Sequence, residues 1–161
     1  MYNKLNKTDN SLEEIFKVAF EKNAAPTAIF NLDTTIAMVN DAYCECSGYT
    51  REEIIGMSWT KQLPPEELER LIEYNRKRLA NPDSVSSKYE FAFYTKHGQL
   101  KYGFTSIATL LQHEILIMSF VDVTEEKQIA IKLAQRSIEK QELIEKRNKE
   151  FKKTRCSYIC R

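Results

Sequence analysis

The side chains that could do redox or metal chemistry in this sequence are few, and their spacing suits neither. The four cysteines form two close pairs, Cys44 with Cys46 and Cys156 with Cys160. The long interval between the pairs matches no zinc-finger or zinc-ribbon spacing, and nothing in the sequence requires a disulfide. Ordinary packing is the simplest interpretation of Cys44 and Cys46, with redox sensing as the alternative.

Motifs for nucleophilic or acid–base catalysis are also missing from the sequence. It contains no glycine-rich phosphate loop, no Gly-x-Ser-x-Gly turn and no His-Glu-x-x-His pair. The adjacent carboxylates Glu66-Glu67 and Glu125-Glu126 fall at predicted helix starts, where the helix dipole favours negative charge. Residues 123–161 contain no histidine that could accept a phosphoryl group. We therefore expect no enzymatic activity from this chain.

Capping signals and hydrophobic periodicity predict the helices. Ser11-Leu12-Glu13-Glu14 is a capping box that opens an amphipathic N-terminal helix. Asn40 or Asp41 caps a short helix over 42–47, and the capping box Thr50-Arg51-Glu52-Glu53 opens a second one. A longer helix begins at Pro65 and ends before residues 81–83.

Five stretches rich in β-branched and aromatic residues predict strands, at residues 27–32, 35–39, 85–94, 100–111 and 115–121. Asp33-Thr34 separates the first two as a tight hairpin, and short turns join the last three. Strands joined by short turns are antiparallel neighbours. The predicted fold is therefore α+β, with one antiparallel sheet and the helices gathered on one face.

The last predicted strand is apolar on both faces. Leu116, Met118 and Phe120 alternate with Ile117 and with other mostly apolar residues. Both faces of the sheet must therefore be covered. The internal helices can cover one, and the other is left for the N-terminal helix, a second copy of the chain, or both. This pattern predicts a homodimer formed through the N-terminal helix, the outer sheet face and the C-terminal helix, while a monomer with a docked N-terminal helix stays open.

Asp122-Val123-Thr124 marks the point where the last strand passes into a long charged helix. Asp122 or Thr124 can cap this helix, and Glu125 and Glu126 suit its positive first turn. A sheet joined directly to a helix suits a protein that passes a signal onward.

Several of these segments together resemble a PAS domain of the bacterial sensory-box type, as found in sensor histidine kinases. They occur in the family's order between about residues 12 and 128: Val39-Asn40-Asp41-Ala42-Tyr43, Ser47-Gly48-Tyr49-Thr50-Arg51-Glu52-Glu53-Ile54-Ile55-Gly56, Trp59, Pro65-Glu66-Glu67-Leu68-Glu69-Arg70, Tyr89-Glu90-Phe91 and Asp122-Val123-Thr124. The resemblance implies the PAS fold, a five-stranded antiparallel sheet in the order 2-1-5-4-3 with a pocket between its inner face and the short helices. It also implies an N-terminal flanking helix and a long C-terminal signalling helix, with Asp122 and Thr124 coupling the sheet to that output helix.

PAS relatives bind haem, flavin or small molecules, or serve only as dimerisation and relay modules, so the resemblance leaves the cofactor unknown. Flavin photosensors carry a reactive cysteine in the stretch that matches residues 56–60, which contains no thiol. Haem-binding relatives supply a histidine from the long helix, here 65–80, which has none, and His97 and His113 fall in predicted turns. These positions argue against haem and against a cysteinyl-flavin photoadduct. Non-covalent flavin or a small metabolite stays open.

The expected pocket wall is the inward face of the last three strands together with two helical residues. Its predicted members are Trp59, Asn75, Phe91, Phe93, Phe104, Met118 and Phe120. Asn75 stands out because an amide within an apolar helical stripe needs partners. The alternative interpretation is that the aromatic residues simply fill the core.

The C-terminal segment differs in charge from the rest of the chain. Residues 1–126 carry 13 Lys and Arg against 19 Asp and Glu, which gives −6, whereas 127–161 carry 11 against 4, which gives +7. A short coiled coil and a solvated single helix both fit its pattern. Basic charge also suits nucleic acid, but the interleaved acidic residues argue against that partner.

The predicted organisation is an N-terminal flanking helix at 1–23, a PAS sensor domain at 24–122, a signalling helix at 123–155 and an irregular tail at 156–161. Met1 to Asn10 lacks the apolar run of a signal peptide, and no segment reaches the ~20 apolar residues of a membrane span. We therefore expect a cytoplasmic setting.

The predicted function is that of a sensor or relay in a two-component-type pathway. The alternatives are a truncated sensor histidine kinase, a flavin-binding redox sensor and a nucleic-acid-binding adaptor. The ligand, the effector, the completeness of the chain and the disulfide state of Cys156 and Cys160 stay open.

Overall fold

The computed structural model describes residues 9–159, which divide into two compact units, one ending at Val123 and the other beginning at Thr124. In chain order the elements are α1 (Asp9–Glu21), β1 (Thr27–Asn31), β2 (Ile36–Val39), α2 (Asp41–Ser47), α3 (Arg51–Ile54), η1 (Trp59–Gln62), α4 (Pro65–Ala80), η2 (Pro82–Ser84), β3 (Lys88–Tyr94), β4 (Leu100–Leu110), η3 (Leu111–His113), β5 (Ile115–Asp122) and α5 (Thr124–Ile159), where η denotes a 3-10 helix.

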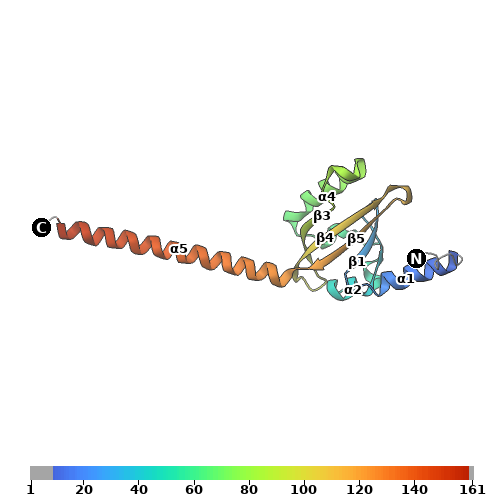
Figure 1. Cartoon of the computed structure of the whole chain (residues 1–161), viewed down its shortest axis with the longest axis horizontal. Coiled ribbons are helices and arrows are strands. Elements are labelled where there is room, and N and C mark those ends of the chain that lie inside the picture. The colour runs from blue at the N-terminus through green and yellow to red at the C-terminus, as the bar shows by residue number, and fades with distance from the viewer. Residues whose placement is uncertain (1–8, 160–161) are drawn as a thin grey trace, which may run out of the picture. The chain divides into compact units, whose positions relative to one another are not determined.

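The five strands form one antiparallel sheet in the order β2-β1-β5-β4-β3, which confirms the predicted PAS topology. β5 is the central strand, with β1 on one side and β4 on the other (Figure 1). The chain leaves the sheet at one edge, β2, and re-enters it at the opposite edge, β3. The helical segment between these two strands must therefore pass across the width of the sheet.

The core lies between that helical segment and the inner face of the sheet. Tyr43 of α2, Ile54 of α3 and Leu71 of α4 are buried there. The inner-face side chains that they meet are Ala28, Phe30, Phe91, Phe93, Leu116, Met118 and Phe120. Full burial of one large apolar side chain contributes about 1.5–3 kcal/mol, so this layer is the main source of stability.

The short helices α2 and α3 begin where the sequence predicts. The Asn40 side chain accepts a hydrogen bond from the backbone N–H of Tyr43 and so caps α2. Gly48 ends this helix at φ 76°, a left-handed conformation that glycine adopts without a steric penalty. Thr50 and Glu53 form both hydrogen bonds of the predicted capping box at α3.

One residue that was predicted to face the core lies on the outer face of the sheet. Phe104 lies on the outer face of the sheet, 44% exposed and opposite Val121 of β5. Because side chains alternate along a strand, the neighbouring positions Gly103 and Thr105 face inward. The space at Gly103 is occupied by neighbouring rings: a Cβ there would lie 2.5 Å from Cε1 of Phe91 and 3.0 Å from Cδ2 of Phe120. β4 contributes no aromatic ring to the core at this point because β3 and β5 already fill the space.

The outer face of the sheet carries apolar side chains that a single chain leaves exposed. Val121 is 60% exposed, and Met38, Phe104 and Leu110 are each 40–44% exposed. α1 does not bury its own apolar residues either, because Leu12, Ile15, Phe16 and Val18 are 49–57% exposed. Only its last turn is anchored, where Phe20 is buried.

Both terminal helices are longer than the sequence predicted. α1 begins at Asp9, ahead of the expected cap at Ser11. α5 continues through the predicted irregular tail as far as Ile159, and Cys160 lies outside the described residues. Apolar side chains of α5 such as Ile129, Leu133 and Ile138 are 58–60% exposed in the single chain. Within residues 9–159, no helix is both long enough and apolar enough to cross a membrane.

Replacement of Gly103 by alanine tests the close packing of β4 against its neighbours. The added methyl group must displace the Phe91 ring, and overpacking of this kind costs about 1–3 kcal/mol. We expect Gly103→Ala to lower the free energy of unfolding by that amount in urea denaturation. Ser106→Ala, an exposed position on the same strand, is the control and should change stability by less than about 0.5 kcal/mol. Equal stability of the two variants would contradict the inward packing of Gly103.

Candidate functional site

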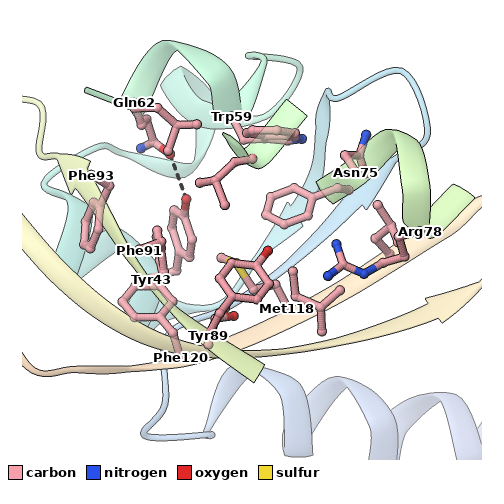
Figure 2. Close-up of a pocket in the computed structure, with 16 residues that line it drawn as sticks. Tyr43, Trp59, Gln62, Asn75, Arg78, Tyr89, Phe91, Phe93, Met118 and Phe120 are labelled. Carbon is pink, nitrogen blue, oxygen red and sulfur yellow. Dashed lines mark hydrogen bonds between the residues drawn. The ribbon is translucent and has the colours of Figure 1, made fainter. Parts of the chain in front are cut away.

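A cavity of about 60 Å³ lies between the inner sheet face and the helices that cross it (Figure 2). Its wall combines side chains from the sheet with others from α2, η1 and α4. The lining residues are Phe30, Tyr43, Trp59, Gln62, Leu63, Leu71, Asn75, Arg78, Tyr89, Phe91, Phe93, Thr105, Ile107, Leu116, Met118 and Phe120.

Six of the seven predicted pocket residues line this cavity: Trp59, Asn75, Phe91, Phe93, Met118 and Phe120. Phe104 does not, because it lies on the other face of the sheet. Whether the six bind a ligand stays a prediction.

The phenylalanine rings pack against one another as well as against the cavity. Phe91, Phe93 and Phe120 have ring centroids 5.4 Å apart in all three pairs. The Tyr43 ring stands edge-on to Phe120 at 6.0 Å. These distances are typical of favourable aromatic pairs. The phenylalanines therefore fill part of the core, as the alternative interpretation held, and also form one wall of the cavity.

Apart from Asn75, the polar residues of the wall were not predicted from the sequence. The Tyr43 hydroxyl donates to Oε1 of Gln62 at 2.8 Å, and burial raises the pKa of Tyr43 well above its ordinary value. Arg78 of α4 is also buried and lies over the Tyr89 ring. Its position three residues after Asn75 on the helix could have predicted a shared face. Gln62 gave no comparable signal because η1 is a single short turn.

The residues of the wall argue against haem and against a cysteinyl-flavin photoadduct. The cavity is also smaller than the pockets of about 300–1,000 Å³ that hold drug-sized ligands. The lining residues include no histidine and no cysteine. Within the described part of the chain, no group of three or more His, Cys, Asp or Glu side chains is placed to hold a metal ion.

At the end of β5, the carboxylate of Asp122 has two partners in the first unit. Nζ of Lys101 lies 3.0 Å from Oδ2, and the Cys46 thiol donates to the same oxygen over 3.7 Å. Burial raises the pKa of the Cys46 thiol, which favours its protonated, donating form. Partial burial alone would lower the pKa of Lys101, but the contacts with Asp122 and Cys46 raise it above its ordinary value. α5 begins two residues later at Thr124, and the capping role expected of Asp122 and Thr124 stays a prediction.

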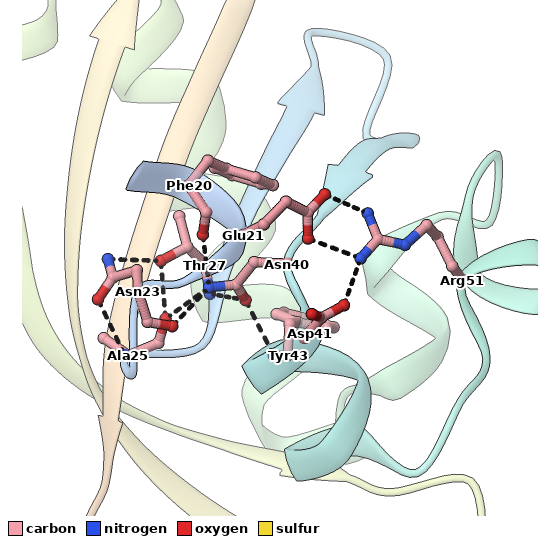
Figure 3. A network of polar contacts seen from close by, with 9 residues as sticks. All are labelled: Phe20, Glu21, Asn23, Ala25, Thr27, Asn40, Asp41, Tyr43 and Arg51. Carbon is pink, nitrogen blue, oxygen red and sulfur yellow. Dashed lines mark hydrogen bonds and ion pairs between the residues drawn. The ribbon is translucent and has the colours of Figure 1, made fainter. Parts of the chain in front are cut away.

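A buried amide connects the start of the sheet with the last turn of α1 (Figure 3). Asn40 is fully buried, and its Oδ1 accepts from the backbone N–H groups of Thr27 and Tyr43 at 2.9 and 3.0 Å. Its Nδ2 donates to the carbonyl oxygens of Phe20, Asn23 and Ala25 at 3.0–3.2 Å. One side chain therefore fixes the end of α1, the start of β1 and the start of α2.

An ion pair reinforces this attachment from the side of α3. The guanidinium of Arg51 donates to both carboxylate oxygens of Glu21, at 2.6 and 2.8 Å, and also to Asp41 at 2.8 Å. The hydrogen bond from Arg51 holds the pKa of Glu21 below its ordinary value. Because these side chains are partly exposed, the pair contributes modestly to stability, on the order of 1 kcal/mol or less.

Comparison with known proteins places this architecture in a family. The family model described as the PAS fold matches residues 20–128. The chain belongs to the PAS family. The matched region of this PAS domain begins at Phe20, whose carbonyl Asn40 binds, and includes the cavity and the Asp122-Val123-Thr124 junction. No curated protein matches the sequence.

Solved structures of PAS domains resemble the chain in fold. One is the PAS domain of a protein from Colwellia psychrerythraea, with a TM-score of 0.61 and 17% identity over 71% of this chain and 98% of that one. Another is a domain of a sensory box sensor histidine kinase/response regulator from Geobacter sulfurreducens, with a TM-score of 0.62 and 16% identity over 72% and 98%. An RNA-binding light-oxygen-voltage receptor has a TM-score of 0.66 and 18% identity over 85% of this chain but 40% of its own.

Removal of the Asn40 amide tests its role in this PAS domain. Asn40→Ala leaves buried backbone groups of three elements without partners, so we expect a loss of about 3 kcal/mol in the free energy of unfolding. Urea denaturation followed by circular dichroism measures this change. Asn31→Ala is the matched control, because the Asn31 amide is exposed and should contribute less than about 0.5 kcal/mol. Similar losses of unfolding free energy in the two variants would show that Asn40 does not connect these three elements.

Proposed function

We propose that this PAS domain is a sensory relay, which binds a small ligand in the inner cavity and passes the signal through Asp122-Val123-Thr124 to α5. The observation that carries the proposal is the position of α2. Its Tyr43 lines the cavity and bonds to Gln62, and its Cys46, three residues later, donates to Asp122. A ligand that moves Tyr43 would therefore move a partner of the junction.

β5 supports the relay by a second route. Met118 and Phe120 lie in the cavity wall, and Asp122 ends the same strand. Phe120 lies two residues before Asp122, so a change in the packing of its ring would shift the strand next to the junction. Two elements thus lead from the cavity to Asp122.

We propose that the domain acts as a homodimer. In the single chain, apolar side chains are exposed on α1, on the outer sheet face and along α5, and Phe104 and Val121 face each other across neighbouring strands. Association through these surfaces would remove the apolar area from water. The monomer with a docked N-terminal helix has less support, because α1 leaves its own apolar residues about half exposed.

A histidine kinase is the effector we propose, because two of the similar structures are PAS domains of sensor histidine kinases. The cavity volume argues against the flavin-binding alternative. The likeness to an RNA-binding receptor concerns fold alone, so the basic C-terminal segment stays the only support for a nucleic-acid partner. The cytoplasmic setting and the lack of enzymatic activity stay predictions.

Asp122→Ala tests the relay. Loss of the carboxylate removes the contacts with Lys101 and Cys46, so we expect altered ordering or spacing of α5 in the dimer while the core stays folded. Interspin distances between labels at Gln135 measure this spacing, with the label attached by a non-cysteine chemistry because Cys46 belongs to the contact. Asp83→Ala, which removes an exposed carboxylate in η2, should leave the distances unchanged. Unchanged distances in Asp122→Ala would contradict the proposed relay.

Phe104→Glu tests the dimer. A charge in the centre of an apolar contact is costly, so we expect the mass in solution to fall from twice 18.8 kDa to 18.8 kDa, with unchanged circular dichroism. Lys61→Glu changes the charge of an exposed residue on the helix-covered side and should leave the mass unchanged. A dimer that survives Phe104→Glu would exclude the outer sheet face as the contact.

A further inference from the structure

The cavity wall contains a buried positive charge. Arg78 is 3% exposed, and its Nη2 donates to the carbonyl oxygen of Ser86 at 3.0 Å. Its guanidinium carbon lies 5.7 Å from the centre of the Tyr89 ring. In the part of the chain that the structure describes, no ion pair joins Arg78 to a carboxylate. A buried guanidinium with neutral partners is energetically costly, and a bound anion would offset that cost.

A second, independent feature is an unpaired amide on a different element. Gln62 of η1 is 4% exposed and lines the cavity. Its Oε1 accepts from Tyr43, but its Nε2 is buried and has no hydrogen-bond partner in the described residues. Buried polar groups are almost always paired, so an orphaned donor in a cavity wall indicates an absent acceptor.

The two groups, a charge without a carboxylate partner and an amide N–H without an acceptor, come from separate parts of the wall. In Figure 2 the labelled aromatic rings stand between Gln62 and Arg78. Asn75, one helical turn before Arg78, also lines the cavity. An occupant that satisfies these groups must carry negative charge at one end and a second oxygen acceptor at the other.

The rest of the wall and its volume limit the occupant further. The remaining contacts are mainly apolar, from residues such as Phe30, Leu71, Ile107, Leu116 and Met118. A cavity of about 60 Å³ holds roughly five water-sized positions, or on the order of 150 Å³ of liquid. This space suits a short carbon chain with fewer than about ten non-hydrogen atoms.

Resting on the ligand-sensing role proposed above, we propose that the cavity binds a short-chain monocarboxylate with a carbonyl or hydroxyl oxygen near its far end. The carboxylate lies at the guanidinium of Arg78, whose planar N–H groups match two carboxylate oxygens. The carbon chain packs among the aromatic rings. The far oxygen accepts from Nε2 of Gln62. Inorganic phosphate fits less well, because it has no apolar part and brings more negative charge than one guanidinium balances.

Trp59 provides the measurement, because it is the only tryptophan of the chain and lines the cavity. The probe is levulinate (4-oxopentanoate), compared with valerate, which lacks the keto oxygen, and with pentan-2-one, which lacks the carboxylate. Titration of the full chain should change Trp59 fluorescence in a saturable way. We expect levulinate to bind at least about tenfold more tightly than either control, since hydrogen bonds to charged groups are the stronger ones.

Variants of Arg78 and Gln62 test which residue binds which end of the ligand. Arg78→Gln should weaken levulinate to the level of pentan-2-one and leave pentan-2-one unchanged. Gln62→Leu should weaken levulinate to the level of valerate and leave valerate unchanged. Arg78→Lys keeps the charge but loses the planar fork, so it should bind levulinate with intermediate affinity. If circular dichroism shows that Arg78→Gln does not fold, Arg78→Lys takes its place in the comparison.

The assignment of a carboxylate is overturned if levulinate binds no better than pentan-2-one. It is also overturned if levulinate binds equally well to the unsubstituted protein and to both Arg78 variants. Equal binding of levulinate and valerate overturns the assignment of the far oxygen. Saturable binding of pentan-2-one alone would retain a ligand-sensing cavity while excluding this ligand class. The relay itself is tested separately by Asp122→Ala.

Discussion

The fold depends on a single buried amide. Asn40 satisfies backbone groups at the end of α1, the start of β1 and the start of α2, segments that have no regular hydrogen-bond ladder in common. Backbone groups at such joints need partners once water is excluded, and an asparagine offers both an acceptor and donors from one position. The place of α2 relative to the sheet follows from this tie. The cavity follows in turn, because α2 supplies the tyrosine that closes one side of it.

Packing in the inner layer explains why a cavity is present at all. Three phenylalanine rings at mutual distances of 5.4 Å fill part of the space, and they can approach one another because Gly103 has no side chain. Polar side chains lie on both sides of these rings (Figure 2). On one side is Gln62, whose Nε2 has no hydrogen-bond partner among the described residues, and on the other is Arg78, which has no carboxylate partner among them. The same layer thus combines tightly packed rings with polar groups that give the cavity a chemical reason to accept another molecule.

Much of the architecture could be predicted from local signals in the sequence. The hairpin turns, the capping box at Thr50 and the change of periodicity after Asp122 are local, and the structure places them as expected. Phe104 was wrongly predicted to face inward. Which residues of β4 face inward depends on Gly103, because the rings of Phe91 and Phe120 occupy the space beside it, and these rings come from two other strands. The spacing of Arg78 from Asn75 could have predicted that both lie on one face of α4, but not that Arg78 is buried there, since burial of a polar side chain depends on tertiary packing. Gln62 could not be predicted to line the cavity, because η1 is a single short turn. The start of α1 at Asp9 and the continuation of α5 to Ile159 were also missed. The capping box at Ser11 indicated a later start, and the loss of the helical charge pattern after residue 155 indicated an earlier end, but neither local signal decided where the helix stops.

The partial enclosure of the cavity has a consequence for timing. Most of its lining side chains are buried, while Trp59, Leu63 and Asn75 keep some contact with solvent. The proposed ligand would leave more slowly the more of its surface these side chains cover, because differences in affinity arise mainly from the rate of dissociation. Such a sensor would average over fluctuations in ligand concentration that are briefer than the residence time of the ligand. The packing around the cavity would thus set a memory time for the signal.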